Sequence, residues 1–137
     1  MIAEELVRRR EHDFSVRERL LEAGRLNDGY DPEMEAVHLG NAAWLEAVVE
    51  KYGYPTIGRV GADASNAAWL IIQHAISRPA FLRRMLAVLR SLPEHEADPK
   101  NAAYLEDRIR MYEGKPQRYG TCLLYTSPSP RDLSTSR

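Results

Sequence analysis

The chain has 137 residues, of which 44% are hydrophobic and 28% charged, and its formal net charge is −1. This length and apolar content fit one globular domain with its own core, and a single cysteine excludes a disulfide scaffold or a zinc site made of several thiolates. No apolar run approaches the roughly 18 residues of a membrane span, and the near-neutral charge lacks the basic surplus that nucleic-acid binding needs. We therefore expect a cytoplasmic protein with neither a membrane nor a nucleic-acid partner.

The first half of the chain predicts two long helices. Residues from about 3 to 26 mix leucines with Glu and Arg at helical spacing, and Asn27-Asp28-Gly29 ends the pattern. Residues 32–52 follow Asp31-Pro32 and place apolar side chains at steps of three and four, which indicates a second helix. Residues 53–62 are expected to form an irregular loop, in which a short, isolated strand is possible.

The second half predicts three more helices. Residues from about 63 to 77 are apolar around the whole helix circumference, which is typical of a buried central helix. Pro79 suits the first turn of a fourth helix that runs to Leu92, and Asp98-Pro99 opens a fifth that ends near Tyr112. With no convincing sheet, the sequence predicts an all-α fold of about five helices packed around the central one.

The polar pair Gln73 and His74 is the most informative candidate for chemistry. Both residues lie near the end of the most apolar helix, where a buried imidazole or amide must find hydrogen-bond partners. The other candidates interrupt the apolar stripes of neighbouring helices or lie in the loop after the last helix. They are Asn41, Asp107, Arg108, Gln117, Arg118 and Tyr119.

Two hypotheses for this polar cluster stay open, so the sequence leaves it undecided whether the protein is an enzyme. In the first, the cluster is a small-molecule binding or catalytic pocket, with His74 as proton carrier, Asp107 orienting its ring and Arg118 holding an anionic group. In the second, the protein is a non-catalytic interaction or accessory module, and the cluster is a structural network that fixes helix register. The partner is then an unknown small molecule or a protein.

The sequence predicts no metal ion and no cofactor. His12, His38, His74 and His95 lack the spacing that puts two ligands on one helix face. A metal site would need ligands assembled from several helices.

The C-terminal segment, residues 122–137, differs in composition from the rest, because Ser, Thr and Pro dominate it. Cys122 to Asp132 can be back-translated into the end sequence and adapter of a transposase-based sequencing library. We therefore predict that residues 122–137 are a non-native, disordered extension, and that residues 1–121 form a single helical domain truncated at its C-terminus. The thiol of Cys122 is accordingly left out of the candidate chemistry.

Four motifs in a fixed order extend the interpretation. They are Tyr52-Gly53-Tyr54-Pro55, Gln73-His74-Ala75, Asp107-Arg108 and Gln117-Arg118-Tyr119-Gly120-Thr121. With them, about residues 13 to 121 resemble a bacterial family that carries only a domain-of-unknown-function label. In that family a further Gln follows the last motif, where this chain has Cys122. The resemblance implies a small, mainly helical domain and supplies no reaction.

Overall fold

The computed structural model describes residues 1–27 and 29–121, so the predicted non-native segment 122–137 lies outside the described residues. Its elements follow one another as α1 (Ile2–Glu22), α2 (Pro32–Tyr52), α3 (Ile57–Val60), α4 (Ala62–His74), α5 (Pro79–Ser91), the 3₁₀ turn η1 (Glu94–Glu96) and α6 (Lys100–Tyr112). The all-α prediction is confirmed. The strand considered within residues 53–62 was wrong, because the described chain has no strand and α3 occupies that loop.

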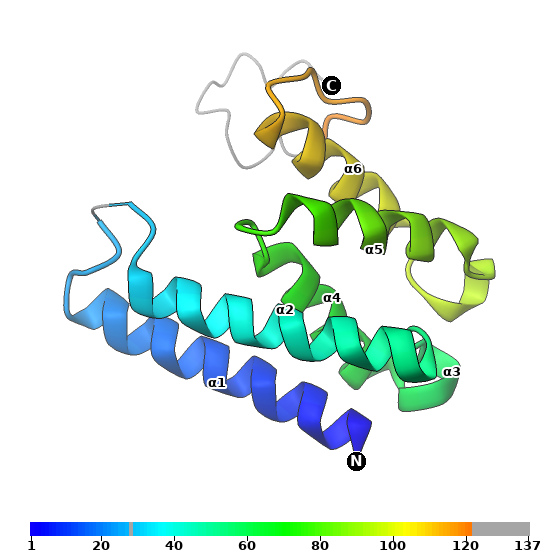
Figure 1. Cartoon of the computed structure of the whole chain (residues 1–137), viewed down its shortest axis with the longest axis horizontal. Coiled ribbons are helices and arrows are strands. Elements are labelled where there is room, and N and C mark those ends of the chain that lie inside the picture. The colour runs from blue at the N-terminus through cyan, green and yellow to red at the C-terminus, as the bar shows by residue number, and fades with distance from the viewer. Residues whose placement is uncertain (28, 122–137) are drawn as a thin grey trace.

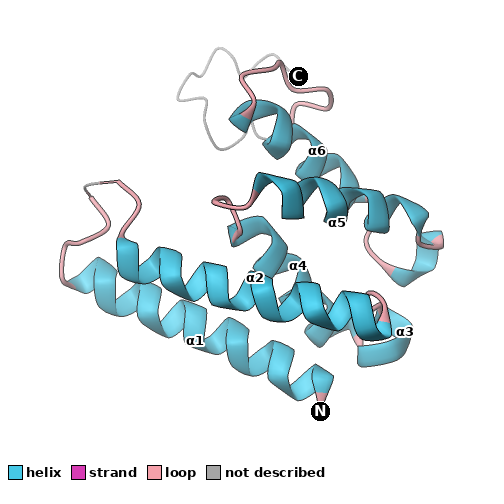
Figure 2. Ribbon diagram, in the orientation of Figure 1, coloured by secondary structure: helices cyan, strands magenta, loops and turns pink. Residues whose placement is uncertain are grey.

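The helices form two groups that meet at α4. Figure 1 shows α1 and α2 side by side and antiparallel, with α4 behind them and α3 at the far end of α2. The second group, α5 and α6, lies on the other side of α4 (Figure 2). None of the described helices combines the length and the apolar character that crossing a membrane requires.

The predicted central helix is confirmed in α4, which contacts α1, α2, α3 and α5. Ala67, Ala68, Ile71 and Ile72 are buried on its inner faces. The helix is not apolar around its whole circumference, because the polar side chain of Asn66 is exposed. The buried side chains of α4 therefore belong to one core cluster that also contains residues of α1, α2, α5 and α6.

Prolines mark two helix boundaries around the core: the start of α2 at Pro32, and the connection from α4 to α5 before Pro79. Asp31 caps α2, since its Oδ1 accepts hydrogen bonds from the backbone N–H groups of Glu33 at 2.8 Å and Met34 at 3.4 Å. The central helix was predicted to reach residue 77 but ends at His74. Proline disfavours helical geometry in the residue before it, so the chain leaves the α4 helix ahead of Arg78 before α5 begins at Pro79.

Candidate functional site

Three titratable side chains from three helices meet beside the core, and we call them the polar centre: Asp13 of α1, His38 of α2 and His74 of α4. Oδ2 of Asp13 lies 2.8 Å from Nδ1 of His74 and 3.2 Å from Nε2 of His38. The two imidazole ring centroids are 4.8 Å apart. Relative side-chain exposure rises from 1% at Asp13 to 12% at His38 and 27% at His74, so the centre has a buried carboxylate and one partly exposed ring.

Helical spacing brings Asp13 and His38 to the core side of their helices. Asp13 lies three residues before the buried Val16 and seven before the buried Leu20 on α1. His38 lies four residues after the buried Met34 on α2, and three before the buried Asn41. Residues three, four or seven apart share a face of a helix, so both polar side chains point where their apolar neighbours point.

The phenol of Tyr30 extends the polar centre toward the loop before α2. Its hydroxyl contacts Nδ1 of His38, and the two rings are tilted by 30° with 5.7 Å between their centroids. Burial raises the pKa of Tyr30 to about 12, and the nearby carboxylates of Glu35 and Asp13 act in the same direction. Tyr30 is therefore a neutral phenol at physiological pH and can donate or accept a hydrogen bond at His38.

Asp13 is ionised in this arrangement. Burial by itself would raise the pKa of the Asp13 carboxyl, but the contacts with His38 and His74 outweigh burial and hold that pKa well below its usual range. An ionised carboxylate only accepts hydrogen bonds, so Nδ1 of His74 and Nε2 of His38 donate to it. The second oxygen, Oδ1 of Asp13, is buried and has no hydrogen-bond partner among the described residues.

The polar centre has the composition and size of a metal-ligand set. One ligand atom from each of Asp13, His38 and His74 lies within 4.8 Å of the others. A tetrahedral Zn²⁺ about 2.1 Å from each ligand separates neighbouring ligand atoms by roughly 3.4 Å, so the 2.8 and 3.2 Å contacts around Asp13 would lengthen slightly. Ligand atoms that are now up to 4.8 Å apart would have to move closer. In the metal-free protein, the ring N–H groups of His38 and His74 donate hydrogen bonds to the buried carboxylate of Asp13. A bound cation would replace these two protons and balance the charge of the carboxylate.

His74 lies in the polar centre, whereas Asp107 does not contact it. The expected pairing of His74 with Asp107 is replaced by the contact with Asp13, because both oxygens of Asp107 are occupied elsewhere. Oδ1 accepts from the backbone N–H groups of Arg118 at 2.7 Å and Tyr119 at 3.0 Å, and Oδ2 accepts from the N–H of Thr121 at 2.8 Å and its hydroxyl at 2.7 Å. Asp107 thus anchors the loop after α6.

The guanidinium of Arg118 contacts Glu106, with 3.4 Å between Nη1 and Oε2. The ring of Tyr119 lies beneath the same guanidinium, 5.6 Å from its carbon to the ring centroid, and is half-exposed. Gln117 belongs to the same loop. These residues form a group at the end of α6 that is separate in its contacts from the polar centre.

The remaining predicted residues are dispersed. Asn41 is buried, and its Oδ1 accepts a hydrogen bond from Arg9 of α1 at 2.9 Å. Gln73 is half-buried next to His74, and Arg108 is half-buried on α6 with its Nε lacking a partner among the described residues. The residues predicted to line a single pocket therefore lie in three places: at the polar centre, around the loop after α6, and at the contact between Asn41 and Arg9.

Sequence reasoning missed Asp13 and gave His38 too little weight. A usable indication was present for both: an acidic residue and a histidine stand at stripe positions that otherwise hold buried residues. Tyr30 carried no such indication, because it lies in a loop whose direction depends on the packing of α1 against α2.

Comparison with known proteins places the chain in a family without an assigned activity. A family model described as a family of unknown function (DUF6624) matches residues 1–127. The chain belongs to DUF6624. The match extends past Thr121, and no curated protein or solved structure matches this DUF6624 chain. What the DUF6624 fold does must therefore be argued from its own polar centre.

Proposed function

We propose that the protein binds a divalent first-row transition-metal ion at the polar centre and uses it to bind or activate a small molecule. The observation that supports this is the convergence of Asp13, His38 and His74 from three helices, with their ligand atoms within 4.8 Å of one another. Two imidazoles favour ions such as Zn²⁺ over Mg²⁺ or Ca²⁺, which prefer oxygen ligands. The metal-free expectation from the sequence is revised because the ligands come from separate helices.

The surroundings of the ligands support the proposal. If Nε2 of His38 binds the ion, its Nδ1 carries the proton and donates it to the Tyr30 hydroxyl that it contacts. Histidine ligands commonly donate their second N–H in this way, which fixes the ring orientation. The unpartnered Oδ1 of Asp13 is a further buried oxygen that a bound ion would satisfy.

Three protein ligands leave a coordination position open. In metalloenzymes such a position holds water or a substrate atom, and the ion either lowers the pKa of the water or polarises a substrate oxygen. His74 is the most exposed of the three ligands, so the open position is expected on its side of the polar centre. A small molecule with an oxygen donor is the class of ligand that fits it.

The direct test is a calorimetric titration of the full chain with ZnCl₂. The lone thiol is first removed by Cys122→Ser so that it cannot bind the ion. We expect one ion per chain, and replacement of His38 or His74 by Ala should weaken binding at least about 100-fold, because each removes a ligand rather than an outer partner. With Co²⁺ as the probe, the visible absorption bands should report a low-coordinate site.

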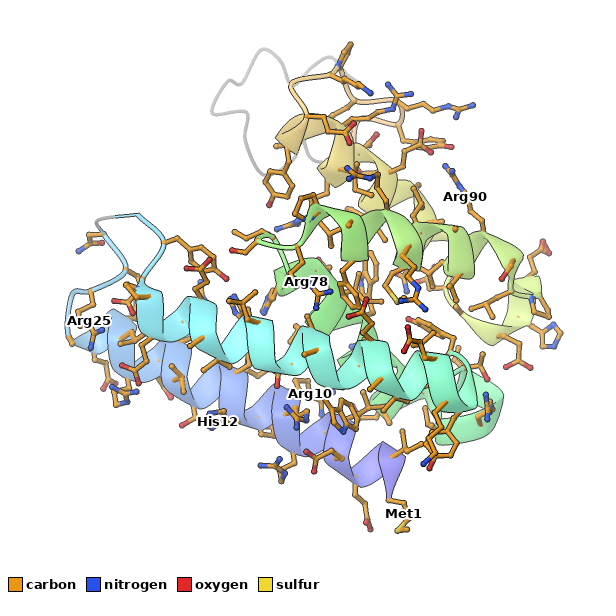
Figure 3. The ribbon with its side chains drawn as sticks, viewed as in Figure 1. Met1, Arg10, His12, Arg25, Arg78 and Arg90 are labelled. Carbon is orange, nitrogen blue, oxygen red and sulfur yellow. The ribbon has the colours of Figure 1, made fainter. Side chains whose placement is uncertain are left out.

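Two other histidines provide matched controls. His12 is next to Asp13 in sequence but exposed, on the outer side of α1 in Figure 3, and His95 is 81% exposed in its side chain. His12→Ala and His95→Ala should bind Zn²⁺ as tightly as the parent chain. If the parent binds no stoichiometric ion, or if His38→Ala binds equally well in a folded chain, the proposal is wrong.

A structural role for the polar centre is the second candidate, and a specific feature favours it. A continuous chain of contacts joins the loop before α2 to three helices, and it runs through Tyr30, His38, Asp13 and His74. In that case Zn²⁺ should not bind, while His74→Gln should lower stability in the metal-free protein. The same titration separates the two candidates.

The location and origin of the protein belong to this proposal as well. A single cysteine in 137 residues is consistent with a reducing compartment, so we expect it in the cytoplasm. The motif resemblance points to a bacterial source. Fractionation of cells that express a tagged full chain tests the location.

A further inference from the structure

A second candidate site lies at the opposite end of the helix pair α1–α2 from the loop that contains Tyr30. The start of α1, the end of α2 and α3 enclose a pocket of about 370 Å³ that is open to solvent. Its walls are mainly apolar and include Ile2, Ala3, Val48, Pro55 and Val60. This volume is at the lower end of the range of small-molecule sites.

The charged side chain that lines this pocket is a cation. Arg59 of α3 lines it, and no acidic residue does. The described part of the chain shows no ion pair or hydrogen bond for the Arg59 guanidinium, whereas the amino terminus beside the pocket is paired with Glu4 at 2.8 Å. The nearby carboxylate of Glu96, in the 3₁₀ turn η1 that packs on α3, does not line the pocket. Its Oε1 accepts a hydrogen bond from the backbone N–H of Gly58 at 3.0 Å. An anion in the pocket would therefore meet a cation and no lining carboxylate.

The backbone holds Arg59 at the pocket wall. A Cβ added to Gly53 would stand 2.9 Å from Nη1 of Arg59, so the guanidinium packs directly on the last turn of α2. A cation is favoured beside the carbonyl end of a helix, so the end of α2 favours this placement of the exposed Arg59 guanidinium, which uses none of its donors on another described side chain. The N–H groups of the guanidinium stay available for a ligand.

We propose that this pocket binds a monocarboxylate with a medium-length apolar tail, with the carboxylate on Arg59 and the tail on the apolar wall. An apolar wall selects for a tail, since burial of apolar surface drives binding, and a guanidinium recognises a carboxylate through paired N–H donors. Neither acetate, which lacks the tail, nor octanol, which lacks the charge, satisfies both parts. This inference is independent of the metal site, because it shares no residue with the polar centre.

The test uses octanoate, octanol and acetate as probes in ¹⁵N-resolved NMR titrations of the full chain. Octanoate should give saturable shifts at Val48, Gly53 and Val60. Octanol should bind about fivefold more weakly through the tail alone, because a partly exposed ion pair contributes up to about that factor, and acetate should give no saturable shift.

Substitution of the cation supplies the decisive comparison. Arg59→Gln should lower the octanoate affinity about fivefold, to the level of octanol, and leave octanol binding unchanged. Arg17→Gln, on the exposed side of α1, is the matched control and should change neither. The same spectra show that each variant is folded.

Three results overturn the proposal: no saturable shift at the pocket, equal affinities for octanoate and octanol in the parent chain, or unchanged octanoate binding in Arg59→Gln. Loss of Zn²⁺ binding in the polar-centre variants has no bearing on any of them.

Discussion

Oδ2 of Asp13 lies 2.8 Å from Nδ1 of His74, although 61 positions separate the two residues in the chain. The contact joins the middle of α1 to the last residue of α4, at the edge of the shared core. The acceptor, Asp13, is buried and ionised, and the donor ring of His74 is partly exposed. Removal of the contact should therefore have consequences for stability as well as for ligand binding.

In the metal-free protein, Asp13→Ala should lower the free energy of unfolding by about 3 kcal/mol. The substitution leaves the donors of His38 and His74 without their buried acceptor, and loss of one partner from a buried pair is costly. Urea unfolding followed by circular dichroism measures the change. Asp63→Ala removes a carboxylate that is 73% exposed, although paired with Arg10, and should cost much less. Equal effects of the two substitutions would contradict the burial argument.

Asp107→Ala should release the loop that follows α6 while the helices stay folded. Four hydrogen bonds from Arg118, Tyr119 and Thr121 end on this one carboxylate, which is 0% exposed. Amide hydrogen exchange measures the effect: the amides of these three residues should lose protection, while those of α4 keep theirs. Retained protection at Thr121 would show that other contacts hold the loop.

Asp107 should also contribute to acid sensitivity. Burial by itself would raise the pKa of Asp107, but the N–H groups of Tyr119, Thr121 and Arg118 and the hydroxyl of Thr121 outweigh it and hold the pKa below the usual range. Since the folded-state pKa is lower than the unfolded value of about 3.9, the carboxylate stabilises the fold above about pH 4. That stability is lost as the pH falls through the folded-state pKa.

The pH dependence predicts a difference between two chains. Between pH 5 and about pH 2, the parent should lose more unfolding free energy than Asp107→Asn, whose amide does not titrate. Urea midpoints at successive pH values measure it. Parallel curves for the two chains would rule out a contribution from this carboxylate.

Two glycines of the same helix region should respond to alanine in opposite directions. Gly53 has φ of 87° and its added Cβ would stand 2.9 Å from Nη1 of Arg59, so Gly53→Ala should destabilise by about 1–2 kcal/mol. Gly40 lies inside α2 with nothing within 4 Å of the added Cβ, so Gly40→Ala should stabilise by about 0.5–1 kcal/mol. Thermal unfolding measures both, and a stabilising Gly53→Ala would contradict the conformational argument.

Local sequence patterns were enough to predict most of the helices. The second helix was predicted over residues 32–52, and α2 has these bounds, because Asp31-Pro32 and Gly53 mark its ends chemically. The central helix was recognised from apolar residues on all sides. The short α3 was missed because a helix of four residues that includes Gly58 is too short to show helical periodicity, and α4 ended early because of the turn required before Pro79.

The sequence by itself determined an all-α domain with a buried central helix and marked His74 as its most notable polar residue. Only the tertiary structure decided that His74 meets Asp13 and His38, while Asp107 holds a loop. The physical reason is the range of the interactions. Helix formation and capping depend on residues within a few positions, whereas the polar centre depends on how three helices are placed and rotated against one another. That placement is set by the packing of the whole core, which a local pattern does not contain.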